Sequence, residues 1–398
     1  ANAVAASSLT VSRWLLAAIS SLSPFGISIM VPLVPMLSLS MAHSVSELQY
    51  LFSIYVIGLA VSQPIFGLIT DRIGRRTVLL SGFGVFVLSS ILLMFADTLA
   101  MMILLRFLQA VGVGVGTVVA RGIIRDHLPP DEALKAFALL TAAMGFTPVI
   151  APVVGGFLAP LLGLKSVFLL LAIVGAGLLL LCFHSIPKDT APDSGARHSA
   201  SIKGYLSVLR SRAFWGHTGA FGFLQGMVFT LMASGSVLFE EQFGLSITRF
   251  SLVWGGSALV YVLGSFLLSR LSALGSPRWQ HTAAIGMLLV SLCTAALILW
   301  QGLSFGLVVV SLFSSMLLSG ILTPTTMYGA VNAVPLWSGS AAGLSSSVGM
   351  TMAGLFSWLG AAAYETDPAL IMLCFGGAGC GFVACWWAAH HNTPSPAL

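Results

Sequence analysis

Charged residues are scarce in this sequence. Asp, Glu, Lys and Arg make up 7% of its 398 residues, whereas soluble domains carry about 25%. The mean hydropathy is +1.00, and no single soluble core could bury so much apolar surface. The scarcity of charge therefore excludes a soluble globular domain and predicts an all-α membrane protein that crosses the bilayer several times.

Motifs for catalysis and metal binding are also missing. The sequence contains no Ser-His-Asp, HExxH or phosphate-loop pattern, so we predict no enzyme activity, no cofactor and no nucleic-acid partner. Its cysteines lack CxxC spacing and accompanying histidines, and each falls in an apolar stretch. We therefore expect buried thiols, rather than disulfides or a metal site, at Cys182, Cys293, Cys374, Cys380 and Cys385.

No acidic residue stands in the middle of an apolar stretch. All of them lie at the ends of such stretches or between them: Glu47, Asp71, Asp97, Asp126, Asp131, Glu132, Asp189, Asp193, Glu240, Glu241, Glu365 and Asp367. A carrier driven by protons needs a group that titrates as access alternates, and the one histidine expected inside the bilayer is His217. His217 is therefore a candidate proton carrier. The alternatives are an interfacial histidine at the membrane edge, and Glu240 and Glu241 at the outer end of the seventh predicted span as the carriers.

Long apolar runs, in contrast, are abundant. A membrane-spanning helix needs about 20 apolar residues. Twelve stretches fit, at approximately 13–37, 47–70, 77–96, 99–123, 133–160, 164–186, 213–238, 249–270, 281–301, 304–327, 338–362 and 367–389. The long polar segment 187–212, with a short surface helix expected at 202–209, separates six predicted spans in residues 1–186 from six in 213–398.

The basic residues orient these predicted spans. All of them except Arg106, Lys165 and Arg249 fall at span ends or in loops that share one side. Loops rich in Lys and Arg stay in the cytoplasm. We therefore predict a multi-pass protein with both termini in the cytoplasm.

Four charges stand close together between the second and third predicted spans: Asp71, Arg72, Arg75 and Arg76. They cannot lie in hydrocarbon, so this segment is predicted to be a short aqueous turn. Gly67 would allow another helix to approach closely, and Gly74 would permit a tight reversal. The pattern Gly-x-x-x-Asp-Arg-x-Gly-Arg-Arg resembles the signature loop of the major facilitator superfamily. A generic positive-inside hairpin loop is the alternative.

The resemblance covers the whole chain and implies a fold of twelve transmembrane helices in two six-helix, pseudo-symmetric halves. It places the substrate site near the middle of the membrane, between the halves. It also implies a cytoplasmic gate, in which Asp71 lies near the start of the eleventh span and interacts with Arg121 or Arg125. In the same gate, Arg75 would pair with Asp126.

The fourth predicted span contains the string R-F-L-Q-A, which resembles the superfamily's second motif with Ala110 in place of a glycine. Arg106 lies about seven residues into this span, roughly 10 Å deep, where a guanidinium is costly unless it is paired or hydrated. We expect it to face a central cavity, and Gln109, one turn on, to share its hydrogen bonds. The alternative is an arginine that snorkels to the outer interface.

The fifth predicted span reads T-P-V-I-A-P-V-V-G-G-F. Two prolines four residues apart bend a helix, and Gly155 and Gly156 allow a neighbour to pack closely. Together with Pro152, these glycines resemble the antiporter motif of drug exporters, in the form typical of the Bcr/CflA group. The alternative is a kinked packing helix with no part in export.

One position departs from that group, whose first span carries a proton-binding aspartate where this chain has Ser28. With no acid near Arg106, the predicted cavity would be positive and would favour an anionic or zwitterionic substrate. Backbone carbonyls or water could satisfy the arginine instead. The other side chains expected to line the cavity are Gln109, Ser28, Tyr55, Met144, Phe221, Gln225, Trp254 and Tyr261.

Two functions fit these patterns. The first is a proton-coupled secondary active transporter that exports a small organic molecule, drug-like or metabolic, across a bacterial cytoplasmic (inner) membrane by alternating access. The second is a dedicated transporter of an anionic, carboxylate-rich metabolite such as a siderophore, coupled without an acid in the first span. A transport-dead scaffold or sensor would need a soluble domain, and the longest polar segment is too short for one. We expect a monomer that interacts with substrate, protons and the lipid bilayer.

Overall fold

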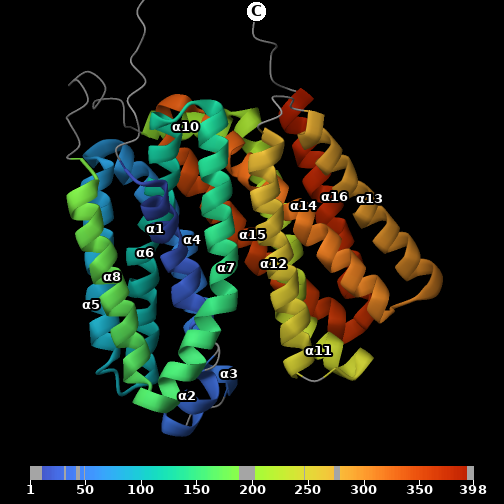
Figure 1. The fold of residues 1–398 in the computed structure, drawn as a ribbon, viewed down its shortest axis with the longest axis horizontal. Coiled ribbons are helices and arrows are strands. Elements are labelled where there is room, and N and C mark those ends of the chain that lie inside the picture. Colours follow the sequence, from blue (N-terminus) through green and yellow to red (C-terminus); the bar gives the residue numbers. More distant parts are fainter. Residues whose placement is uncertain are drawn as a thin grey trace, which may run out of the picture. The chain divides into compact units, whose positions relative to one another are not determined.

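The computed structural model describes residues 11–30, 33–41, 45–48, 50–187, 202–245, 247–272 and 278–391. All regular structure in these ranges is helical (Figure 1), as predicted. The helices are α1 (Arg13–Ser28), α2 (Val34–Met41), α3 (Val45–Leu48), α4 (Tyr50–Ile73), α5 (Arg75–Leu93), α6 (Leu99–His127), α7 (Pro130–Leu162), α8 (Lys165–Ser185), α10 (Ile202–Arg210), α11 (Arg212–Phe243), α12 (Ile247–Ser272), α13 (Arg278–Gln301), α14 (Phe305–Asn332), α15 (Ser338–Thr366) and α16 (Pro368–His391).

Each of the predicted apolar stretches contains at least one of these helices. In the described part of the chain, 8 helices are long and apolar enough to cross a membrane, namely α4, α5, α6, α7, α8, α13, α14 and α16. A shorter apolar helical segment covers Leu252–Leu268. The chain is therefore a multi-pass membrane protein, and the exact number of spans stays a prediction. Helix α10 confirms the short helix expected in the polar segment, whose residues 188–201 lie outside the described ranges.

The first predicted span is wrong as a single continuous helix. Helix α1 ends at Ser28, and α2 begins at Val34. Between them, the amides of Met30 and Leu33 donate three-residue hydrogen bonds of the tighter 3-10 type. A proline at position 35 fits the first turn of α2, because the amide donor that it lacks would have no partner within the helix there.

The reversal predicted at Gly74 is confirmed. Helix α4 continues through the charged segment to Ile73, and α5 begins at Arg75, so a single residue separates the two helices. Gly74 has φ 105° and ψ 154°, a conformation that only glycine adopts without strain. The aqueous turn is therefore shorter than the sequence suggested.

The described helices belong to two compact units. The first comprises Ala1–Pro130, Phe146–Val208 and Leu336–Ser347, and the second comprises Asp131–Gly145, Leu209–Pro335 and Val348–Leu398. Helices α7 and α15 each contribute residues to both units. The division into halves at residues 187–212 is a proposal about internal repeats and stays a prediction.

Helix α6 forms the core of the first unit. It packs against α1, α4 and α5, and α5 packs in turn against α8 (Figure 1). The middle of α6 is buried continuously from Gly112 to Ile124. Polar residues that α6 carries are therefore enclosed by neighbouring helices instead of facing lipid.

The core of the second unit consists of large apolar side chains on α11, α13, α14 and α16. Phe239, Leu312, Phe375, Phe382 and Trp386 are almost completely buried in it. All five cysteines are free thiols, but only Cys182 is buried as expected: Cys293 is exposed on α13, and Cys374, Cys380 and Cys385 are half-buried. An apolar position on a membrane helix can face lipid as readily as the protein interior.

Candidate functional site

Arg106 lies at the centre of a buried polar network in the first unit. Its side chain is 0% exposed. Its Nη1 donates to the carbonyl of Gly26 on α1 at 3.1 Å and to Oε1 of Gln109 at 2.6 Å. Its guanidinium carbon lies 4.2 Å from the centroid of the Tyr55 ring on α4, a cation–π contact.

Gln109 and Tyr55 extend this network to further helices. The Gln109 amide donates from Nε2 to the Ser90 hydroxyl on α5 at 2.7 Å. The Tyr55 hydroxyl donates to the Ser23 carbonyl on α1 at 3.2 Å. The Arg106 network, by which we mean Arg106, Gln109, Ser90 and Tyr55, therefore joins α1, α4, α5 and α6. The hydrogen bond expected between Arg106 and Gln109 is present, and a snorkelling arginine is excluded by its burial.

Among the described residues, no carboxylate forms an ion pair with Arg106. The ion pairs found in the described residues involve Arg75 and Arg125, both with Asp126. Backbone and amide oxygens satisfy Nη1, while Nε and Nη2 have no hydrogen-bond partner among the described groups. A buried guanidinium with two unused donors is costly, and these donors match the two oxygens of a carboxylate.

Ser28 lies close to this network along the chain. It is the last residue of α1 and 6% exposed. Two residues before it, the Gly26 carbonyl accepts the Arg106 hydrogen bond. Side chains two residues apart on a helix do not face each other, so the expected place of the Ser28 side chain beside Arg106 stays a prediction.

The remaining predicted cavity residues belong to the second unit: Met144, Phe221, Gln225, Trp254 and Tyr261. Trp254 stacks on Phe250 with ring centroids 6.1 Å apart. Tyr261 and Phe221 pack tightly against glycines of α7 and α15, respectively. That these residues share one cavity with Arg106 stays a prediction.

A second polar cluster joins the start of α5, the end of α6 and the start of α15 within the first unit. Arg75 forms an ion pair with Asp126, the pairing expected from the sequence, and donates to the Ser338 hydroxyl at 2.9 Å. Ser338 donates to Asp126 Oδ1 at 3.1 Å. Arg121, which is 2% exposed, donates to the Ser346 hydroxyl. We call Arg75, Arg121, Asp126, Ser338 and Ser346 the Arg75 cluster.

The backbone of α15 lies very close to α4 beside this cluster. A Cβ atom on Gly67 would lie 2.5 Å from the Gly339 carbonyl oxygen, and one on Gly343 would lie 2.2 Å from that of Gln63. Both distances are below any ordinary contact, so only glycine fits at either position. The close approach predicted for Gly67 is thereby confirmed, with the start of α15 as the neighbour.

The other predicted gating residues have different surroundings. Arg125 contributes a longer contact of 3.5 Å to Asp126. The side chains of Asp71 and Arg72 lie outside the described part of the structure, so the expected role of Asp71 stays a prediction. Sequence reasoning missed Ser338 and Ser346, although the run S-G-S-A-A-G-L-S-S-S of small residues was a signal for close packing.

The motif of the fifth predicted span lies on α7. Pro148, Pro152 and Pro160 all fall inside this helix. A Cβ atom on Gly155 would lie 2.4 Å from the Ile29 carbonyl oxygen at the end of α1, whereas Gly156 is exposed. Gly155 therefore has the close-packing role that the sequence predicted, and a role of this motif in export stays a prediction.

His217 lies on α11 among aromatic side chains of α16. Its ring centroid is 5.3 Å from that of His390 and 6.3 Å from that of Trp386. Nδ1 of His217 is buried without a hydrogen-bond partner among the described groups. These surroundings place His217 next to a second titratable ring, and its role as a proton carrier stays a prediction.

Comparison with known proteins identifies the family. The model of the Major Facilitator Superfamily matches residues 16–358. The "Uncharacterized MFS-type transporter YdgK" of Bacillus subtilis is 28% identical over 351 residues, covering 86% of this chain and 87% of that protein. The "Multidrug resistance protein MdtL" of Escherichia coli O157:H7 is 29% identical over 245 residues, 62% of each chain.

Two solved structures share the fold. The Major Facilitator Superfamily transporter FucP has a TM-score of 0.74 at 15% identity, covering 96% of this chain and 99% of its own. The human organic anion transporter MFSD10 has a TM-score of 0.72 at 16% identity, covering 95% of this chain and 98% of its own. Helical architecture, family model and relatives agree: this chain belongs to the Major Facilitator Superfamily and is a membrane transporter, not an enzyme.

Proposed function

We propose that this protein exports a small organic molecule across the bacterial cytoplasmic membrane by alternating access, coupled to protons. The observation that carries the proposal is the Arg75 cluster. Hydrogen bonds of Ser338 with Arg75 and Asp126, and of Ser346 with Arg121, hold the start of α15, and the ion pair between Arg75 and Asp126 fixes the two side chains that bind Ser338. Such polar contacts are individually weak and reversible, which suits a gate better than a permanent core.

Helix α15 continues from the first unit into the second, so a gate at its start can affect both units. Its first residues, up to Ser347, belong to the first unit, and the rest of the helix belongs to the second. Breaking the Arg75 cluster would release the start of α15 from α5 and α6. A helix that is held by separable contacts at one end can then move with the second unit during alternating access.

The relatives support export of drug-like molecules. One is named a multidrug resistance protein and shares 29% identity with this chain. To test export, wild type and Asp126→Asn would be expressed in a bacterial strain depleted of efflux pumps, and ethidium and fluorescein retention would be measured. We expect wild type to lower the retention of at least one dye and Asp126→Asn to restore it. Equal retention in wild-type and empty-vector cells would count against the proposal.

The second candidate is transport of an anionic metabolite, and the Arg106 network favours it. Within the described part of the chain, Arg106 is buried without a carboxylate partner and retains two unused donors, which suit a carboxylate-bearing substrate. Competition between dyes separates the two candidates. An anionic transporter should prefer fluorescein over ethidium, and a preference for ethidium would favour cationic drugs.

A further inference from the structure

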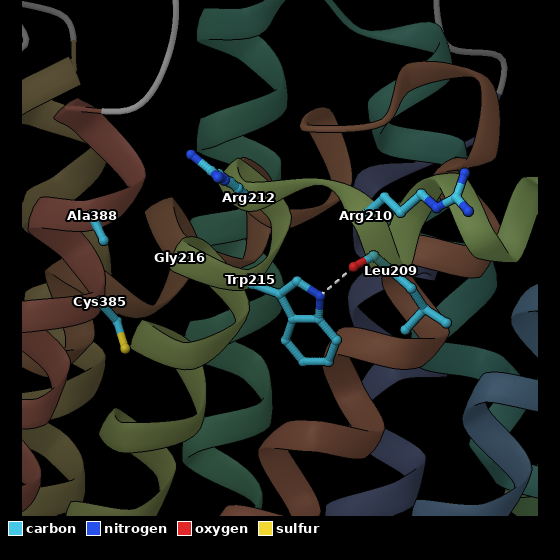
Figure 2. Close-up of a pocket in the computed structure, with 7 residues that line it drawn as sticks. All are labelled: Leu209, Arg210, Arg212, Trp215, Gly216, Cys385 and Ala388. Carbon is cyan, nitrogen blue, oxygen red and sulfur yellow. Dashed lines mark hydrogen bonds between the residues drawn. The ribbon is translucent and has the colours of Figure 1, made fainter.

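A pocket of about 450 Å³ lies where the end of α10, the first turn of α11 and the last turns of α16 meet (Figure 2). All of its lining residues belong to the second unit. Arg210 and Arg212 contribute the charge, while Leu209, Trp215, Cys385 and Ala388 contribute apolar surface. No acidic side chain lines the pocket, so it has a net positive charge beside an apolar wall.

The two arginines flank the indole ring of Trp215. In Figure 2 their side chains extend away from each other, with the guanidinium groups above the ring, one to either side of it. Both side chains are exposed. Arg212 is also the first residue of α11, a helix of 32 residues, and the positive end of its dipole adds to the attraction for an anion.

Trp215 and α10 present apolar surface beside these charges. The indole Nε1 of Trp215 donates to the Leu209 carbonyl at 2.7 Å, which fixes the ring against the end of α10. Trp215 is 41% exposed, and Leu206 and Leu209 are each 40% exposed. Val208, on the opposite side of α10, is fully buried. A short helix with one packed face and an exposed apolar and basic face is typical of the membrane surface.

The place of the pocket residues on α16 also indicates that the pocket lies at the membrane surface. Helix α16 is long and apolar enough to cross a membrane over Pro368–His390. Cys385 and Ala388 fall near the end of that stretch. The pocket therefore lies where the chain leaves the hydrocarbon, the level at which tryptophan rings and phospholipid headgroups are found.

We propose that this pocket binds an anionic phospholipid. The headgroup phosphate lies at the rim of the pocket, beside Arg210 or Arg212, and an acyl chain lies along Trp215 and the apolar residues of α16. Charge complementarity selects an anionic lipid over a zwitterionic one, because the described lining residues include two cations and no carboxylate. The apolar wall distinguishes a lipid from a free phosphate, since a soluble ion leaves that surface uncovered. The bound lipid fixes α10 to the membrane surface.

The test uses the full chain in detergent, with bound lipid counted by native mass spectrometry. Phosphatidylglycerol is titrated against phosphatidylcholine, and wild type should retain the anionic lipid preferentially. Arg210→Gln and Arg212→Gln should each weaken phosphatidylglycerol binding about fivefold, and the double variant about 30-fold. Arg270→Gln, an exposed arginine of the same unit outside the pocket, is the matched control and should stay within about twofold of wild type.

Two further measurements separate the contributions of the arginine charges and of the lipid acyl chains to binding. The double Arg→Lys variant keeps both charges and should retain phosphatidylglycerol binding within about threefold. Soluble glycerol 3-phosphate carries the phosphate without acyl chains and should compete at least about 100-fold more weakly. Equal retention of the two lipids by wild type would overturn the proposal, even if a variant failed to fold. So would unchanged binding in the double Gln variant, or competition by glycerol 3-phosphate at lipid concentrations.

Discussion

Replacing Asp126 with asparagine removes the only carboxylate of the Arg75 cluster while keeping its shape. The Arg75 side chain is 14% exposed and that of Asp126 is 34% exposed, so solvent screens their attraction and the ion pair stabilises by about 0.5–1 kcal/mol. Weakening the Ser338 hydrogen bond adds about 0.5–1 kcal/mol. The closed cluster should lose about 1–2 kcal/mol in total, which raises the fraction of molecules with a released α15 about 5- to 30-fold.

Hydrogen–deuterium exchange measures this fraction directly. Amides at the start of α15, residues 338–347, exchange when the helix is released and opens locally. Their exchange should be about 5- to 30-fold faster in Asp126→Asn than in wild type. Asp97→Asn removes an exposed acid outside the cluster and should leave exchange unchanged.

A double-mutant cycle isolates the pair itself. If Arg75→Gln and Asp126→Asn act through the same contact, the double variant should accelerate exchange little more than either single variant. Unchanged exchange in Asp126→Asn, or full additivity of the two substitutions, would refute a gate that depends on this ion pair.

Three further predictions address the other parts of the site. Arg106→Lys keeps the charge but loses the planar fork, so binding of an anionic substrate should weaken about tenfold or more in equilibrium titrations; unchanged affinity would make Arg106 purely structural. Gly343→Ala puts a Cβ atom 2.2 Å from the Gln63 carbonyl oxygen, so it should accelerate exchange at the start of α15 as Asp126→Asn does and lower transport several-fold. Ser28→Asp adds a titratable group near the Arg106 network, so it should give transport a new dependence on pH near neutrality and weaken anion binding; a wild-type pH profile would contradict this placement.

The structural roles of residues with strong backbone or charge preferences could be predicted from the sequence. Gly74 was expected at a reversal and has a positive φ. Arg75 and Asp126, 51 residues apart, were expected to pair and do. The need of Arg106 for polar partners followed from its place in an apolar run, and it has them in Gly26 and Gln109. In each case a charge or a glycine can be satisfied in few ways, so the sequence constrains the structure.

Hydrogen-bond partners that are backbone groups or small hydroxyl side chains could not be predicted from the sequence. The Gly26 carbonyl that binds Arg106 is a backbone group, which any residue type would supply. Ser338 and Ser346 contact residues 212 and 225 positions away, and serine in an apolar helix indicates close packing without naming the neighbour. The break after Ser28 was missed because hydropathy averages over a span and does not register a local loss of helical hydrogen bonds.

Coupled transport is the central claim, and proteoliposomes test it most directly. Purified protein would be reconstituted with fluorescein or ethidium, and dye movement followed with and without an imposed pH gradient. We expect movement of at least one dye that is faster than in protein-free liposomes, is accelerated by the gradient, and loses this acceleration when nigericin dissipates the gradient. His217→Gln should lose the acceleration if His217 carries the proton. Wild-type movement that is no faster than in protein-free liposomes, or that does not respond to the gradient, would contradict proton-coupled transport.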